Sequence, residues 1–189
     1  MPAPAPPADL ASLGLADIAR LADERKLPPV EQWDPSHCGD SAMRIARDGT
    51  WYHEGSPIGR PAMVRLFSTI LRREPDGRFV LVTPVEKLDI LVEDAPFVAV
   101  EVKSEGSGRE RALAFRLNTG DLVIAGPDHP LRLEDHDDGP HPYLRVRPGL
   151  EARLARPVYY ELAELALEEG AEPAGLWSKG VFFPLDTGR

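Results

Sequence analysis

Residues 43–53 read MRIARDGTWYH and residues 112–125 read ALAFRLNTGDLVIA, and these two stretches decide the fold. Each consists of two short, largely apolar runs joined by a turn, Asp48-Gly49 in the first and Asn118-Thr-Gly120 in the second. Asp-Gly between short alternating runs is a strong hairpin signal, because both turn positions favour positive φ. The two stretches therefore predict two antiparallel hairpins in a β-rich protein.

The two predicted hairpins resemble each other. An offset of 71 residues places Gly49 on Gly120 and Trp51 on Leu122, and each hairpin is followed by a Gly/Pro corner. The likeness predicts an internal duplication. We expect a flexible Pro/Ala-rich lead over residues 1–15, an N-terminal unit over 16–103 and a C-terminal unit over 104–189. Units of this size bury little surface alone, so they should share a face, and the crevice between them is the expected ligand site.

Helical patterns flank the predicted strands. Residues 61–74 read PAMVRLFSTILRRE, with a proline suited to the first helical position and apolar residues at helical spacing. This pattern predicts a helix with Arg72 and Arg73 in its last turn. A helix from about Ala16 and a final helix over residues 157–169, ended by Gly170, complete an α+β fold of two β-rich units.

The composition is that of an ordinary globular protein. Apolar residues make up 42% of the 189 residues and charged residues 28%. The net charge of −9 excludes bulk, sequence-independent binding of nucleic acid, which depends on neutralising phosphates. No apolar stretch approaches the roughly 20 residues of a membrane-spanning helix. A single cysteine excludes an internal disulfide and favours a reducing compartment, so we expect a cytoplasmic protein.

Positive charge is concentrated in one part of this acidic chain. Residues 43–73 hold two acidic residues and six arginines, namely Arg44, Arg47, Arg60, Arg65, Arg72 and Arg73. The planar guanidinium matches the paired oxygens of phosphate or carboxylate. One interpretation is a solvated surface whose arginines pair with nearby acids. The other is an anionic ligand held between the units by Arg44, Arg60 and Arg65, with Lys87 from a nearby turn.

Two tryptophans and one irregular segment are further candidates for the site. Trp51 and Trp177 could pack beside a ligand, although core packing is the simpler role for either. His37 and Asp40 lie in an irregular segment of the kind that often lines sites. The same segment contains Cys38, and a His-Cys-Asp run allows an enzyme with a thiol nucleophile. A buried structural cysteine is the alternative, with Asp40 forming a turn.

The remaining patterns name no reaction. Residues 129–141 are rich in aspartate and histidine, but they lack the spacing of zinc or calcium motifs and predict a solvated loop. No nucleotide-binding, metalloprotease or hydrolase signature is present. We therefore predict no cofactor and no metal.

Several strings occur together in a recognisable order, among them CGD at 38–40, DGTW at 48–51, TPVEK at 83–87 and VEDAPF at 92–97. Over residues 33–185 the chain resembles the bacterial family catalogued as domain of unknown function 1285. The resemblance implies two units related by duplication, of which the second is like a pleckstrin-homology barrel capped by a helix. It also implies a binding groove between the units and a role in nucleotide- or nucleic-acid-linked signalling. It assigns no catalytic residues.

We therefore expect a binding protein that holds a nucleotide-like or nucleic-acid-like anion between its two units, with a role in signal transduction. Two alternatives remain at this stage. One is an enzyme that uses His37, Cys38 and Asp40, and the other is a module that binds a protein partner through a sheet edge or its last helix.

Overall fold

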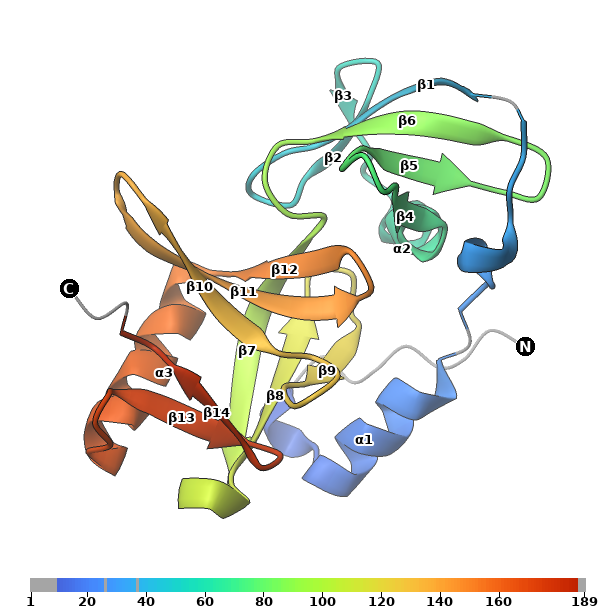
Figure 1. The fold of residues 1–189 in the computed structure, drawn as a ribbon. Coiled ribbons are helices and arrows are strands. Elements are labelled where there is room, and N and C mark those ends of the chain that lie inside the picture. The colour runs from blue at the N-terminus through green and yellow to red at the C-terminus, as the bar shows by residue number, and fades with distance from the viewer. Residues whose placement is uncertain (1–9, 26, 37, 187–189) are drawn as a thin grey trace.

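The chain folds into two β-rich units that follow one another along the sequence (Figure 1). The structure is a computed structural model that describes residues 10–25, 27–36 and 38–186. Each unit contains one six-stranded sheet, and helices are few. The predicted α+β class with two β-rich units is therefore confirmed. Of the expected lead over 1–15, residues 1–9 lie outside the described residues, whereas Leu10–Ser12 forms a short 3-10 helix, η1.

The first sheet is formed by residues 38–92 and has the strand order β3-β2-β1-β6-β5-β4. Its strands β1 and β6 pair in parallel at the centre, and the other neighbours are antiparallel. A short 3-10 helix, η2 (Val30–Gln32), precedes it and contacts β4. In chain order the elements of this unit are β1 (Cys38–Ile45), β2 (Trp51–His53), β3 (Ser56–Pro57), α2 (Pro61–Thr69), β4 (Leu71–Arg73), β5 (Phe79–Val82) and β6 (Lys87–Val92).

The second sheet has the order β10-β11-β12-β7-β8-β9 and curls into a half-barrel (Figure 1). Helix α1 (Leu15–Glu24) packs on its strands β8 and β9, and α3 packs against β7 and the C-terminal hairpin. In chain order the elements are β7 (Phe97–Glu105), η3 (Gly108–Glu110), β8 (Ala112–Leu117), β9 (Leu122–Ile124), β10 (Leu131–His136), β11 (Gly139–Arg147), β12 (Leu150–Leu154), α3 (Arg156–Glu169), β13 (Gly175–Ser178) and β14 (Val181–Pro184).

The two sheets share one topology. When the strands are numbered from one to six within each unit, the first sheet has the order 3-2-1-6-5-4, and the second has the same order when it is read from β9 to β10. In each sheet the first and sixth strands form the central parallel pair. Parallel neighbours need a long crossover connection, so the same arrangement twice in one chain is an unusual coincidence unless the halves are related. The shared strand order supports the predicted duplication.

The repeat has a different register from the predicted one. The offset of 71 aligns the β1–β2 hairpin with the β8–β9 hairpin, whereas the strand order aligns it with β7–β8. The two turns are nevertheless alike, since Gly49 N donates to Ala46 O and Gly120 N donates to Leu117 O, with φ +89° at each glycine. Similar turns therefore produced the offset. Asp48 does not have the positive φ that was expected of it.

The helix predicted over residues 61–74 ends earlier, and its buried face is different. Helix α2 stops at Thr69, and Leu71–Arg73 forms the edge strand β4. Leu66 is one of the apolar residues at helical spacing in this segment, but it is 63% exposed, whereas Ser68 is buried. The sequence pattern fits a helix, but pairing of β4 with β5 fixes the last residues as a strand. Arg72 therefore lies in β4 and is buried.

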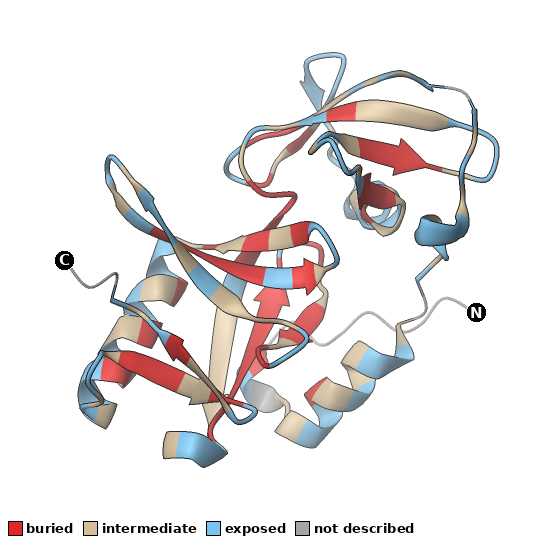
Figure 2. Cartoon of the chain, in the orientation of Figure 1, coloured by how far each residue is buried: buried red, intermediate tan, exposed pale blue. Residues whose placement is uncertain are grey.

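One connected set of buried side chains runs through both units (Figure 2). Trp51 of the first unit and Phe97 and Phe115 of the second are its largest fully buried members. A smaller cluster lies beneath α1, where Ile18 packs with Leu122. The boundary predicted between residues 103 and 104 falls inside β7, and α1 packs on the second sheet although it precedes the first. No described helix is long and apolar enough to cross a membrane.

A buried serine joins the C-terminal hairpin to the second sheet. Ser178 is fully buried, and its Oγ accepts from Leu113 N at 2.9 Å and donates to Ala125 O at 2.7 Å. We expect Ser178→Ala to lower the free energy of unfolding by about 1–3 kcal/mol, because two buried backbone groups lose their partner. Urea unfolding measures the change. Exposed Ser107 offers the control, and equal stability of Ser178→Ala and Ser107→Ala would contradict the prediction.

Candidate functional site

The two units meet at two hairpin turns. Asn118, in the β8–β9 turn, donates from Nδ2 to Gly49 O in the β1–β2 turn at 3.3 Å. The same side chain accepts from Val98 N at 3.0 Å, which fixes its orientation. On β11, Arg147 donates to the carbonyl of Ser68 in α2 at 2.6 Å. These contacts define the seam, the surface along which the β1–β2 turn and α2 face the second unit.

The VEDAPF string forms the chain junction at the seam. Glu93 belongs to the first unit, because it accepts from Arg47 N at 2.9 Å and pairs with Arg44 at 2.5 Å. These bonds lower the pKa of Glu93. The next residue, Asp94, belongs to the second unit and accepts from Tyr143 Oη at 2.7 Å. Burial and this bond raise the pKa of Tyr143. Adjacent carboxylates are thus anchored in different units.

A crevice of about 340 Å³ lies between the two turns. The first unit contributes Trp51 and Arg65, and the second contributes the turn 118–120. Trp51 is only 1% exposed, and its ring lies 6.5 Å from that of Phe67. It therefore forms part of the wall and presents no open face for stacking. Its buried indole nitrogen has no hydrogen-bond partner among the described residues.

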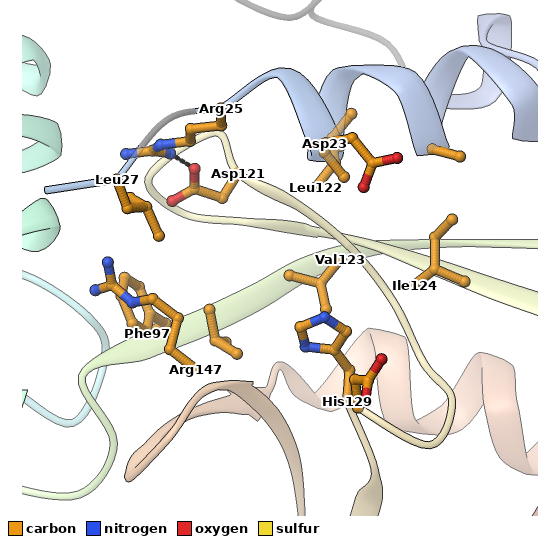
Figure 3. A pocket seen from close by; sticks show the side chains of 14 residues that line it. Asp23, Arg25, Leu27, Phe97, Asp121, Leu122, Val123, Ile124, His129 and Arg147 are labelled. Atoms are coloured by element: carbon orange, nitrogen blue, oxygen red, sulfur yellow. Dashed lines mark ion pairs between the residues drawn. The ribbon is translucent and has the colours of Figure 1, made fainter. Parts of the chain in front are cut away.

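A larger cavity of about 430 Å³ lies on the other side of the β8–β9 turn. It is enclosed by the end of α1, by β9, by the loop that follows β9 and by the end of β11 (Figure 3). Most of its wall is apolar, including Phe97, Val123 and Val146. Two arginines, Arg25 and Arg147, line it as well. We call this space the seam cavity.

Arg147 is the most unusual charged group of the seam cavity. Its guanidinium lies 5.6 Å from the centre of the Phe97 ring, and its buried Nε has no partner among the described residues. The other buried arginines, Arg72, Arg111 and Arg116, each form an ion pair with a carboxylate. Within the described part of the chain Arg147 forms none. Burial and the nearby charge of Arg25 lower the pKa of Arg147 to about 10, and the charge of Glu31 acts in the opposite direction.

Two further arginines extend this positive region. Arg25 follows the last residue of α1 and forms an ion pair with Asp121. Burial and the charge of Arg65 lower the pKa of Arg25. The charge of Arg25 thus lowers the pKa of Arg147, and the charge of Arg65 lowers the pKa of Arg25. Asp121 is the acid that balances part of this charge.

The structure does not bring the predicted cations together. Arg44 is paired with Glu93, and its guanidinium lies 4.2 Å from the centre of the Tyr52 ring. Lys87 pairs with Glu74 at 3.2 Å. Arg44 is aligned with Leu91, four residues along β6 from Lys87, which separates the two cations by about 13 Å along the sheet. Both are neutralised by acids of the first unit.

The other predicted residues are also dispersed. Arg60 is the exposed residue before α2, beside the crevice but outside its lining. Trp177 lies in the C-terminal hairpin, where its ring packs under Arg109 at 4.6 Å. Of the predicted set, the seam therefore contains Arg65 and Trp51.

The segment that suggested a thiol enzyme contributes nothing to a described cavity. His37 lies outside the described residues. Cys38 is exposed rather than buried as expected, because it begins β1 at the outer end of the strand. Asp40 accepts from Ala42 N at 2.8 Å beside an irregularity in the β1–β6 pairing, so it stabilises a bulge. Neither Cys38 nor Asp40 lines a cavity that the structure describes.

Residues 129–141 are more ordered than the predicted solvated loop. They include β10 and the beginning of β11, joined by a tight turn in which His136 pairs with Gly139. The rings of His136 and His141 stack with their centres 4.0 Å apart, and His141 is 7% exposed. Side chains alternate between the two faces of a strand, and this alternation turns the histidines inward. The many charged residues of the segment had instead suggested a solvated loop. Within the described residues no group of side chains is arranged to hold a metal ion.

No pattern in the sequence indicated Arg147 as a site residue. Period-two alternation places Arg145 and Arg147 on the same face of a strand. The β11–β12 pairing shifts register between these two residues, and Arg145 is exposed whereas Arg147 lines the seam cavity. A bulge cannot be located from alternation alone. Arg25 was missed because the arginine concentration begins nineteen residues later.

Comparison with known proteins places the chain among proteins without an assigned activity. Two family models match, the N-terminal domain of a domain of unknown function, DUF1285, over residues 28–95, and the C-terminal domain of a protein of unknown function, DUF1285, over residues 96–185. The crystal structure of a DUF1285 family protein from Silicibacter pomeroyi DSS-3 is 50% identical, with TM-score 0.80, and covers 93% of this chain and 96% of that chain.

A second solved structure, a DUF1285 family protein from Shewanella baltica OS155, is 27% identical with TM-score 0.53. That match covers 66% of this chain and 92% of the other. No curated protein matches the sequence.

Proposed function

The chain belongs to the DUF1285 family, whose members are described only as proteins of unknown function, and we propose that it binds a small anionic ligand in the seam cavity, beside the contact between its two units. The observation that carries the proposal is Arg147, a partly buried guanidinium without a carboxylate partner among the described residues. A buried, unpaired charge is costly, and an anionic ligand in the seam cavity would compensate it.

The surroundings of Arg147 support the same function. The cavity volume of about 430 Å³ is within the range of small-molecule sites, and the wall combines apolar side chains with charged and imidazole groups. Arg25 lines the same space and adds positive charge next to Arg147. A guanidinium with an unused Nε donor can bind phosphate or carboxylate oxygens in pairs.

The finer parts of the proposal concern ligand class and role. A nucleotide-like molecule is our first candidate, because its phosphate suits Arg147 and its base suits the apolar wall. The curled second sheet followed by α3 supports a pleckstrin-homology-like barrel capped by a helix. Binding without turnover suits a signalling role in the cytoplasm. The net charge of −9 opposes extended nucleic acid as the ligand.

Replacing Arg147 tests the proposal. We expect inorganic phosphate and adenosine monophosphate to raise the melting temperature of the wild-type protein, since a ligand that binds only the folded state stabilises it. Arg147→Gln is expected to weaken binding by roughly 10- to 100-fold, the usual effect of losing a charge-assisted hydrogen bond. Thermal shift and isothermal titration calorimetry at low ionic strength measure the two effects.

Arg145→Gln is the matched control, because it removes the same charge from an exposed position two residues away. It should bind both compounds like the wild type. Absence of binding by every anion tested, or equal binding by Arg147→Gln and Arg145→Gln, would exclude the seam cavity as the site.

A further inference from the structure

The seam cavity carries opposite charges in different parts of its wall. Figure 3 shows Arg147 beside Phe97 and Arg25 beside Asp121 at the same end of the cavity, whereas Asp23 lies on α1 toward the end that holds Ile124. A second carboxylate, Asp128, also lines the cavity and immediately precedes His129. The wall between the arginines and Asp23 is apolar and includes Leu122 and Val123 (Figure 3).

The charges of the cavity do not cancel locally. Arg25 forms an ion pair with Asp121 (Figure 3), whereas Arg147 forms no ion pair with a described residue. Asp23 and Asp128 are exposed, and neither forms an ion pair with a described residue. One unpaired positive charge and two unpaired negative charges therefore face the same space of about 430 Å³.

His129 adds an acceptor to the acidic part of the wall. Its Nδ1 lies 3.0 Å from Arg145 O. A carbonyl oxygen only accepts, so Nδ1 must carry the proton, and in the neutral ring Nε2 keeps a lone pair. The imidazole lines the cavity next to Asp128. The lining thus contains an imidazole acceptor in addition to the carboxylates of Asp23 and Asp128.

We infer that the ligand is zwitterionic, with an anionic group that binds Arg147 and an amino group that binds Asp23 and Asp128, joined by an apolar body. This inference rests on the proposed function and narrows it. A ligand with only negative charge would be attracted by Arg147 and repelled by the two carboxylates. A ligand with an amino group at its other end meets complementary charge at both places.

Matched probes separate the two contributions. Hexanoate carries the anion alone, hexylamine carries the cation alone, and 6-aminohexanoate carries both on one apolar chain. We expect the amino acid to bind roughly 10-fold or more tightly than hexanoate, which is the usual worth of a charge-assisted hydrogen bond. The four- and eight-carbon analogues identify the best length, and the tightest amino acid is compared with its own amine-free acid by calorimetry.

Paired variants locate the amino group. Asp23→Asn with Asp128→Asn should remove the advantage of the amino acid over the plain acid without weakening the plain acid. Asp135→Asn with Asp137→Asn is the control, because it makes the same change in net charge at exposed positions of the β10–β11 hairpin. The control should keep the full advantage.

The outcomes distinguish this inference from the function on which it rests. Binding of hexanoate that depends on Arg147, with no gain from an amino group at any length, would overturn the zwitterion and leave the anion site standing. Tighter binding of adenosine triphosphate than of the four-, six- and eight-carbon amino acids would likewise overturn the zwitterion and leave the anion site standing. If neither hexanoate nor inorganic phosphate binds, the proposed function fails and the inference with it.

Discussion

Replacing Arg72 by methionine is expected to lower the free energy of unfolding by about 3–5 kcal/mol, the usual effect of removing one partner from a buried ion pair. Arg72 is 7% exposed. It donates to Val30 O at 2.7 Å, to Trp33 O at 2.6 Å and to Glu74 at 2.8 Å. Methionine fills a similar volume but donates no hydrogen bond. Two backbone carbonyls and a carboxylate would lose a partner together.

The pH dependence identifies Glu74 as part of this effect. The hydrogen bond from Arg72 is the main cause that lowers the pKa of Glu74 below its ordinary 4.5. A carboxylate with a lowered pKa stabilises the folded state above its unfolded pKa, and this contribution disappears as the pH falls through the folded pKa. The difference between wild type and Arg72→Met should therefore shrink below pH 4.5. Urea unfolding at a series of pH values measures it.

Arg73→Met is the neighbouring control. Arg73 is exposed, and its one described side-chain hydrogen bond is to Gly77 O at 3.4 Å. Its loss should change stability by no more than about 0.5 kcal/mol, as is usual for surface positions. Similar losses for the two variants would show that the segment 30–33 does not depend on Arg72 for its attachment to β4.

Arg72 also shows why part of the fold could not be predicted. Local spacing correctly predicted both hairpins, the start of α2 at Pro61 and the last helix, because turn residues and helix ends are determined by neighbours in sequence. Arg72 bonds to carbonyls 39 and 42 residues away. The spacing of residues within a short segment does not reveal contacts with residues so far away in sequence. Arg72 was therefore expected at the end of a helix and not in a buried strand.

The candidate site, like the fold, could be predicted only in part from the sequence. The crevice between two β-rich units followed from the size of the units and the duplicated pattern, and Arg65 and Trp51 do lie there. The concentration of arginines indicated residues 43–73 as the anion site, but a count of charges does not show which arginines form ion pairs with carboxylates. Glu93 and Glu74 neutralise Arg44 and Lys87, whereas an isolated arginine on β11 remains without a described carboxylate. A crevice between the units was predictable, whereas the seam cavity beside it, lined by the end of α1 and by the second unit, depended on tertiary packing.

Replacing Gly49 by alanine is expected to lower the free energy of unfolding by about 2–4 kcal/mol, because the substitution acts on both the turn and the seam. Gly49 has φ +89°, where a side chain is strained. An added Cβ would lie 2.7 Å from Asn118 Nδ2 and 2.9 Å from Val98 Cγ2. Asn118 cannot move aside without losing its bonds to Gly49 O and Val98 N, so the clash must separate the turns of the two units.

Gly55→Ala isolates the contribution of the seam to that loss. Gly55 has φ +82°, close to that of Gly49, but an added Cβ there would meet nothing within 4 Å. It should cost only the conformational strain, about 1–2 kcal/mol. The difference between the two variants, measured by urea unfolding, therefore reports how firmly the two units are held together at the crevice between the two turns. Equal losses would mean that the two turns separate without cost, and the β8–β9 turn beside the seam cavity would then lack a rigid support.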